Sequence, residues 1–248
     1  MKTRHFIVAG STVLASCFMT PLAQADCGPD ALGTARTLTL PREAAAYGQT
    51  QHEALPLQPG EVVLTFDDGP APATTPQVLQ ALKDQCSRAT FLMNGEPLLR
   101  APELALRVRA EGHSVGMHGN THAHAASQTV PEQMADLNAM EAAYRKVFGT
   151  PAAFYRFPFL EETPAMLAEL AARRVTIMSV DLAIDDWLPA QSTAMLTERL
   201  LERLKQTGGG IILMHDIQQQ TADALPTLLK ALKTHGYRVV HLEWQPPE

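Results

Sequence analysis

Short apolar stretches alternate with longer amphipathic stretches along the chain from Glu61 onward. Each short stretch covers six or seven residues rich in Val, Ile, Leu, Phe or Met, which is typical of buried strands. The predicted strands are Glu61–Phe66, Ala89–Asn94, His113–His118, Ala152–Phe157, Val175–Asp181, Gly209–His215 and Tyr237–Leu242.

The longer stretches between these strands carry apolar residues three and four positions apart, which predicts helices with one buried face. The predicted helices are Thr75–Gln85, Pro97–Glu111, Pro131–Phe148, Thr163–Arg174, Thr193–Gln206 and Thr221–Thr234. Seven strands alternating with six helices predict an α/β fold with a parallel sheet and right-handed crossovers. An irregular (β/α)7 barrel is favoured over an open doubly wound sheet, because polar residues follow many strands and no Gly-rich phosphate turn follows an early one.

Residues 26–60 lack this alternation and are predicted to form an N-terminal extension that packs on a catalytic domain spanning 61–248. Residues 1–25 are typical of an export signal, with two basic residues, the apolar run Phe6–Phe18 and an Ala-Gln-Ala cleavage site. We therefore expect a periplasmic or secreted protein. A lipid anchor at Cys17 is a second possibility, since Leu-Ala-Ser-Cys resembles a lipobox.

The charge balance disfavours a nucleic-acid partner. The formal net charge is −6, and removal of Lys2 and Arg4 with the signal leaves 18 basic against 26 acidic residues, a charge of −8. No segment beyond the signal is apolar for the roughly 18 residues that a membrane span requires. The composition leaves the oligomeric state open.

Two cysteines remain after cleavage of the signal, Cys27 and Cys86. Because an exported protein enters an oxidising compartment, we expect a disulfide between them that ties the extension to the body of the protein. Two buried free thiols are the alternative.

Candidate chemistry begins where the first strand ends, at Asp67 and Asp68. Neighbouring residues leaving a strand point in different directions, so one carboxylate can bind a metal while the other accepts a proton; a plain surface turn is the alternative. His118 and His122 follow the third strand and share a face if that segment turns helically. With one Asp they supply the three protein ligands of a catalytic metal that keeps an open position.

Later strand ends carry further chemistry. Arg156 leaves the fourth strand and can orient an acidic group, whereas His215 ends the sixth strand behind an apolar run and is placed for proton transfer. Asp186 and Trp187 follow the fifth strand. Each residue has a structural explanation by itself, but five strand ends with such residues favour one shared site.

These segments, in this order, resemble the five motifs of the NodB-homology polysaccharide deacetylases, carbohydrate esterase family four. The motif segments are Thr65-Phe66-Asp67-Asp68-Gly69-Pro70, His118-x-x-x-His122, Arg156-x-Pro158-Phe159, Asp186-Trp187 and Leu213-x-His215. The resemblance spans about residues 61–242. It implies a deformed (β/α) barrel and removal of N-acetyl groups from chitooligosaccharides, peptidoglycan or exopolysaccharides, or of O-acetyl groups from xylan.

The resemblance also implies a division of roles. Asp68, His118 and His122 would hold a divalent metal, usually Zn²⁺, with Co²⁺, Ni²⁺ or Mn²⁺ as alternatives. The roles implied for the remaining residues are Asp67 as base, Arg156 as the residue that orients it, His215 as acid with Asp186 tuning it, and Trp187, Leu213 and Phe159 in the substrate pocket.

Three departures from the family pattern stand out. Gly119 occupies a position where Ser or Thr usually steadies the loop, so we expect a looser or differently braced loop. Ala183 replaces an Asp four residues before Trp187, which leaves the role of Asp185 open. Phe159 stands where Tyr is common.

We therefore expect an exported, metal-dependent hydrolase acting on a glycan substrate. A non-catalytic glycan-binding barrel and an O-acetyl esterase are the alternatives. The identity of the glycan is not encoded in any motif.

Overall fold

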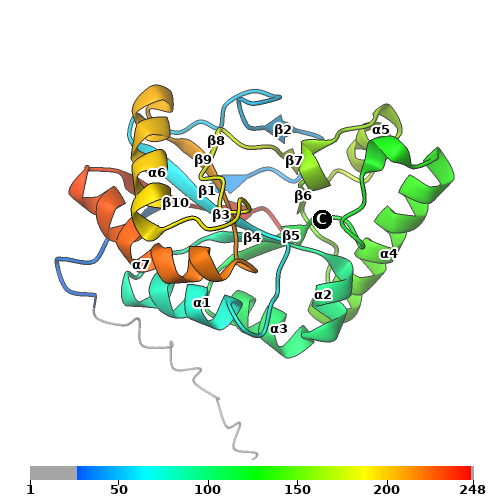
Figure 1. Ribbon diagram of the computed structural model, residues 1–248. Helices are drawn as coiled ribbons and strands as arrows, with labels where there is room; N and C mark the ends of the chain where they lie inside the picture. Colours follow the sequence, from blue (N-terminus) through cyan, green and yellow to red (C-terminus); the bar gives the residue numbers. More distant parts are fainter. Residues whose placement is uncertain (1–26, 247–248) are drawn as a thin grey trace, which may run out of the picture.

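The computed structural model describes residues 27–246, in which helices surround a set of parallel strands (Figure 1). The predicted signal segment 1–25 and the alternative anchor Cys17 lie outside the described residues. Within residues 27–246, no helix is both long enough and apolar enough to cross a membrane.

All described strand pairs are parallel. The strands that continue the predicted pattern are β3 (Glu61–Asp67), β4 (Thr90–Met93), β5 (Ser114–Met117), β6 (Phe154–Tyr155), β7 (Thr176–Met178), β8 (Leu182–Ala183), β9 (Gly210–His215) and β10 (Arg238–Trp244). Neighbours pair in the order β8, β9, β3, β4, β5, β6, β7, and β10 joins the first residues of β3. The α/β fold with a parallel sheet is confirmed, as an irregular barrel whose ring of strand pairing is not closed.

The ring is interrupted in the predicted strand Val175–Asp181, where the expectation of one continuous strand is wrong. Ser179 still donates its backbone N–H to Tyr47 of the N-terminal extension, whereas Asp181 donates to Ile211 of β9. The backbone therefore changes pairing partners midway, and the segment is divided into β7 and β8.

The helices form the outer layer: α6 and α7 lie at the left of Figure 1, α1 to α3 below, and α4 and α5 at the right. Their bounds are α1 Thr75–Asp84, α2 Gly95–Arg100, α3 Pro102–Ala110, α4 Val130–Phe148, α5 Pro164–Ala172, α6 Thr193–Thr207 and α7 Gln219–Thr234. The predicted single helix Pro97–Glu111 is wrong, because it breaks at Ala101 (φ −133°, ψ 56°). A residue before proline is pushed out of the helical region, and Pro102 follows.

The interior of the barrel differs between its two ends. On β3, Val62, Leu64 and Phe66 point outward into the helix-facing core, and Val63 joins a second apolar cluster inside the strands. On β3, β6 and β9 that inner cluster lies toward the start of the strand, at Val63, Phe154 and Ile211. It also contains Leu92, Met178, Val240 and Leu242. The inward positions nearer the carboxyl ends of β3 and β6 are polar instead, at Thr65, Asp67 and Arg156.

The N-terminal extension is more regular than the sequence pattern predicts. Its strand β1 (Thr34–Leu40) pairs with β10 along its length, and β2 (Ala46–Tyr47) pairs with β7. Arg36 forms a two-pronged ion pair with the buried Glu61 at the start of β3. The structure joins Cys27 to Cys86 in a disulfide with a Cα–Cα distance of 6.1 Å. The extension is therefore bonded to both the edge and the base of the barrel.

Candidate active site

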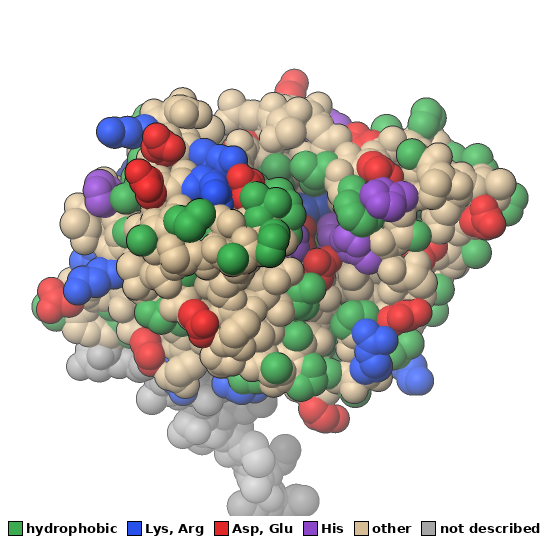
Figure 2. Space-filling model, in the orientation of Figure 1, with side chains coloured by type: hydrophobic (Ala, Val, Ile, Leu, Met, Phe, Trp, Pro, Cys, Tyr) green, Lys and Arg blue, Asp and Glu red, His purple; other side chains and the backbone are tan. Residues whose placement is uncertain are grey.

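The carboxyl ends of β3, β5, β6 and β9 meet at one hollow of the molecule. They bring together Asp67, His118, Arg156 and His215, which are separated by up to about 150 positions in the sequence. Figure 2 shows histidine, acidic and hydrophobic side chains gathered around a hollow in the middle of this face. The strand ends predicted to share a site therefore lie close together in the structure.

Asp67 and Arg156 form a buried ion pair at the floor of the hollow. Arg156 Nη1 donates to Asp67 Oδ1 at 2.7 Å and to Thr65 Oγ1 at 2.9 Å. Arg156 Nε and Nη2 donate to the carbonyls of Met178 and Ser179. Burial raises the pKa of Asp67, while the charge of Arg156 acts in the opposite direction. The guanidinium thus fixes one carboxylate oxygen and leaves Oδ2 facing the hollow, 3.6 Å from His118 Nε2.

Asp68 points into the hollow from a left-handed backbone conformation, with φ of 76°. Its backbone N–H donates to the carbonyl of Leu92, which holds it beside β4. Asp tolerates the left-handed region better than most residues do, because its short polar side chain bonds locally. Its Oδ1 atom is buried without a hydrogen-bond donor among the described residues. A buried carboxylate oxygen in this state is suited to a cation.

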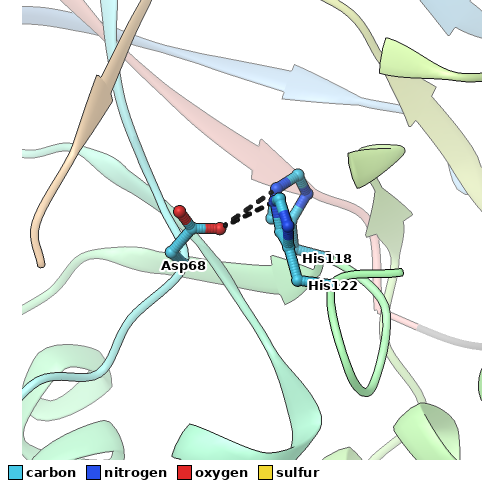
Figure 3. Close-up of side chains that lie close together, drawn as sticks. All are labelled: Asp68, His118 and His122. Carbon is cyan, nitrogen blue, oxygen red and sulfur yellow. Dashed lines mark ion pairs between the residues drawn. The ribbon is translucent and has the colours of Figure 1, made fainter. Parts of the chain in front are cut away.

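The two histidines predicted as ligands face this oxygen (Figure 3). His118 Nε2 lies 3.5 Å and His122 Nε2 3.2 Å from Asp68 Oδ1, and one ligand atom from each of the three residues lies within 4.8 Å of the others. The Nδ1 atom of His118 donates to the carbonyl of Arg156 at 2.9 Å, which leaves Nε2 with its lone pair. Burial lowers the pKa of His118 to about 3, so the imidazole is neutral. This donor set fits a divalent metal.

The segment that carries these histidines is not helical, so the reason given for their convergence is wrong. It turns through left-handed residues instead, with φ of 77° at Gly119 and 56° at His122. Asp136 of α4 braces the turn by accepting from the backbone N–H groups of Asn120 and Thr121 and from the Thr121 hydroxyl. The loop that contains Gly119 is therefore braced by α4, which agrees with the expectation of a differently braced loop.

His215 and Asp186 form a second ion pair, at the carboxyl end of β9. Asp186 Oδ1 accepts from His215 Nδ1 at 2.7 Å, and Oδ2 accepts from the His215 backbone N–H at 2.7 Å. Burial by itself lowers the pKa of His215, but the hydrogen bond and charge of Asp186 outweigh it and raise that pKa to about 9. His215 is therefore protonated at neutral pH, with Nε2 facing Asp68 Oδ2 at 4.0 Å.

Apolar side chains flank the hollow. Leu213 lies inside on β9, whereas the Trp187 ring is exposed and stands edge-on to the His215 ring, with centroids 5.6 Å apart. Phe159 packs edge-on against His122 at 4.4 Å and is half exposed. On another side, a groove of about 520 Å³ runs from Asp68 and His122 toward α2; it is also lined by Pro70, Ala71, Pro72, Asn94, Pro97, Arg100, Ala101 and Ile217.

Asp185 lies outside the acid–base network. Its carboxylate forms a two-pronged ion pair with Arg203, with both distances 2.7 Å, and lies 3.4 Å from Arg199. Its neighbour Asp186 faces inward, because Asp185 has a left-handed φ of 53° that turns the chain between them. The structure thus gives the two adjacent aspartates separate surroundings.

Three polar residues of the site were not predicted. Thr65 accepts from Arg156, Thr221 donates to Asp186 at 2.5 Å, and Asp216 accepts from Thr75 at 2.5 Å beneath Gly69. Burial raises the pKa of Asp216 to about 7. Thr65 could have been found, because strand alternation places it on the same face as Asp67. No sequence signal connects Thr221 with Asp186.

The arrangement combines a carboxylate held by a guanidinium, a donor set for a metal and a protonated imidazole around one opening. A carboxylate whose pKa is raised can accept a proton, and an imidazole with a pKa of about 9 can donate one. Such a site is equipped for hydrolysis, in which water loses a proton and the leaving group gains one.

Comparison with known proteins agrees with this chemistry. The family profile described as polysaccharide deacetylase matches residues 55–177. A chitin deacetylase from Colletotrichum lindemuthianum is 31% identical over 194 residues, covering 74% of this chain and 78% of that protein. The peptidoglycan-N-acetylglucosamine deacetylase of Listeria monocytogenes is 31% identical over 189 residues, covering 73% of this chain but only 38% of the relative.

Among solved structures, a peptidoglycan deacetylase from Bdellovibrio bacteriovorus superposes with a TM-score of 0.76 at 32% identity. The match covers 86% of this chain and 59% of that one. A pseudoenzyme of carbohydrate esterase family four from Bacillus anthracis shares the fold with a TM-score of 0.67 at 19% identity, covering 77% and 74% of the two chains. The shared fold alone therefore does not fix activity.

Proposed function

Because the chain belongs to the polysaccharide deacetylase family, we propose that it is a metal-dependent hydrolase that removes N-acetyl groups from the amino sugars of a polysaccharide or oligosaccharide. The family identity makes it a hydrolase of carbon–nitrogen bonds other than peptide bonds. Chitooligosaccharide, peptidoglycan and exopolysaccharide are the candidate substrates. The relatives named above act on chitin and peptidoglycan, which supports this choice.

The observation that carries the proposal is the separation of two adjacent carboxylates. Asp68 faces two imidazole nitrogens, whereas Asp67 is held by Arg156 at 2.7 Å. If both carboxylates bound the metal, no base would remain beside it. Their different partners support one ligand and one free base.

Asp68, His118 and His122 would hold the metal, with Zn²⁺ as first choice and Co²⁺, Ni²⁺ or Mn²⁺ as alternatives. When bound by these residues, a divalent ion would supply Lewis acidity, polarising the acetamide carbonyl and lowering the pKa of a water molecule. The neutral state of His118 supports its role, because an imidazole binds metal through an unprotonated nitrogen.

Asp67 is the proposed base. Its Oδ2 takes the proton from the attacking water, while Arg156 keeps Oδ1 fixed so that the second oxygen stays aimed at the reacting centre. The guanidinium makes three other bonds, to Thr65, Met178 and Ser179, which hold Arg156 in place.

His215 is the proposed acid. Its Nε2 donates a proton to the amine nitrogen as the carbon–nitrogen bond breaks, since an amine leaves poorly without one. Asp186 keeps the proton on the imidazole at neutral pH and fixes the ring through Nδ1. Trp187 and Leu213 form the proposed pocket for the acetyl methyl group, and the half-exposed Phe159 is a further residue of the proposed substrate pocket.

The cleavable N-terminal segment predicted from the sequence supports export, to the periplasm or the medium. An exported location matches substrates that are components of cell walls or external polymers.

The test is acetate release by purified protein loaded with zinc and incubated separately with N-acetylglucosamine oligomers, peptidoglycan and acetylxylan. We expect release from at least one N-acetylated polymer, abolished by a chelator and restored by metal. Release from acetylxylan alone would identify an O-acetyl esterase. Binding of a polymer without release, at full metal occupancy, would identify a glycan-binding barrel and overturn the proposal.

A further inference from the structure

The N-terminal extension reaches the edge of the active site through one glutamine. Gln51 Nε2 donates to the carbonyl of Leu160 at 2.9 Å, and Gln51 Oε1 accepts from Ser179 Oγ at 2.6 Å. The amide of Gln51 therefore joins two segments more than 100 positions away in the sequence. It lies before residue 55, where the match to the family profile begins.

The backbone around Gln51 is held against the barrel. Gly48 approaches the strand so closely that an added Cβ would lie 2.5 Å from the carbonyl carbon of Ser179. Ser179 donates its backbone N–H to Tyr47, and Thr50 donates to Val180. These contacts on both sides of the turn fix the position of the Gln51 backbone.

The segment that receives this bond is Pro158–Leu160, which carries Phe159. Phe159 and Leu160 both have left-handed backbone conformations, with φ of 56° and 57°. Non-glycine residues stay in this region only where surrounding contacts hold them there. A second contact from the extension lies just beyond, where His52 Nε2 and Glu162 Oε1 are 2.6 Å apart.

The position of the segment Pro158–Leu160 affects the active site through the Phe159 ring. It packs edge-on against His122, with centroids 4.4 Å apart, and stacks on His124 at 3.7 Å. His124 is in turn bonded to Glu161 at 2.8 Å. Any shift of the Pro158–Leu160 backbone would therefore move the aromatic wall beside the proposed metal centre.

We propose that Gln51 is a positioning residue that holds Pro158–Leu160 in its left-handed conformation and so fixes the Phe159 wall of the substrate cleft. The N-terminal extension is then part of the specificity of the enzyme. Gln51 touches neither the metal ligands nor the acid and base, so its loss acts on substrate binding. The kinetic consequence rests on the proposed function, whereas the structural consequence does not.

The test compares Gln51→Leu with Gln49→Leu in the full-length exported protein. Gln49 lies on the same turn, is exposed, and contacts Asp181 through its backbone N–H, so its substitution controls for a general change in the extension. Hydrogen exchange of the peptide covering 157–163 is measured first, because Leu160 and Glu161 donate backbone bonds within this turn. KM and kcat are then measured on the best N-acetylated oligomer.

For Gln51→Leu we expect exchange in 157–163 to accelerate and KM to rise by about 3- to 10-fold, the change expected for one lost hydrogen bond, with kcat within about twofold of wild type. Gln49→Leu should match wild type in both measurements. Ser179→Ala removes the hydroxyl partner of Gln51 but keeps the carbonyl that binds Arg156, so a smaller shift of the same kind is expected.

Unchanged exchange in both Gln51→Leu and Ser179→Ala would overturn the proposal, as would an equal change in Gln49→Leu. Faster exchange with an unaltered KM would overturn the link to substrate binding. If the wild-type protein releases no acetate from any polymer, the proposed function fails, and the exchange measurement still decides the positioning role.

Discussion

The two ends of the barrel interior are built from the same strands but do different work. Toward the start of the strands, Val63, Phe154 and Ile211 belong to a continuous apolar cluster. Toward the carboxyl ends, two or four positions further along the same faces, the side chains are Asp67, Arg156 and His215. One end stabilises the fold by excluding water, and the other holds charged groups in fixed positions.

The comparison explains how a buried ion pair is tolerated at all. A carboxylate and a guanidinium are costly to bury, and the cost is offset only if geometry and additional hydrogen bonds are good. Arg156 makes four such bonds, to Asp67, Thr65, Met178 and Ser179. The apolar end beneath gives these groups a rigid support, because packed side chains resist displacement.

The largest effect should follow from neutralising the proposed base. We expect Asp67→Asn to reduce kcat by about 10²- to 10⁴-fold while zinc remains bound, because the amide keeps the shape but cannot accept the proton. Asp68→Asn should instead weaken zinc retention. Acetate release and metal content after dialysis separate the two variants. Equal metal loss in both would contradict the separate roles.

The apolar end of the barrel interior can be destabilised by a substitution that leaves the site residues unchanged. Phe154 packs against Trp244, with ring centroids 3.9 Å apart, and is buried. We expect Phe154→Ala to lower the free energy of unfolding by about 3–5 kcal/mol, through lost burial and a cavity. Denaturant unfolding measures this change. Where the variant stays folded, kcat should remain near the wild-type value; a loss of kcat like that of Asp67→Asn would erase the distinction between the two ends.

A smaller effect should come from the brace on the histidine turn. Asp136→Ala frees the backbone N–H groups of Asn120 and Thr121, so the turn carrying His118 and His122 loosens. We expect zinc affinity to fall by about 10- to 100-fold, as for other supports of metal ligands. Competition with a chelator measures it. Asn138→Ala on the same helix, whose side chain bonds Arg173, serves as the control and should keep wild-type affinity.

The smallest expected effect is a shift in the pH dependence of kcat. Because the pKa of His215 is raised to about 9, the imidazolium persists at neutral pH, and activity that depends on it should fall only as pH rises through about 9. Asp186→Asn removes the charge that raises this pKa, so the alkaline limb of kcat should move to lower pH. The control is Asp185→Asn, whose carboxylate faces Arg203. If the alkaline limb of kcat in Asp186→Asn stayed at the wild-type pH, His215 would not be the acid.

Much of this organisation was predictable from local sequence. The alternation of strands and helices indicated the parallel α/β fold, and the motif residues indicated which strand ends lie together around one hollow. The break at Ala101 was also encoded locally, by Pro102, although the helix pattern around it concealed the break. Local patterns succeed here because steric preference and burial act over a few neighbouring residues.

The contacts that complete the site were not predictable in this way. The bonds of Asp136 to the histidine turn, of Thr221 to Asp186 and of Gln51 to Leu160 each join segments distant in sequence. Periodicity in the sequence does not indicate these contacts, since many other Asp, Thr or Gln residues of the chain could make similar bonds. They exist only after the sheet has brought the segments together.

The sequence by itself determined which residues can ionise, bind metal or face the interior, because charge, size and strand alternation are local properties. Strand alternation left open which carboxylate meets Arg156 and which meets the histidines; the family resemblance implied that division, and the tertiary structure shows the contacts. Tertiary structure alone decided that the N-terminal extension contacts the segment carrying Phe159. The physical reason is distance: a hydrogen bond is specified to a few tenths of an ångström, and only the packed barrel sets positions that closely.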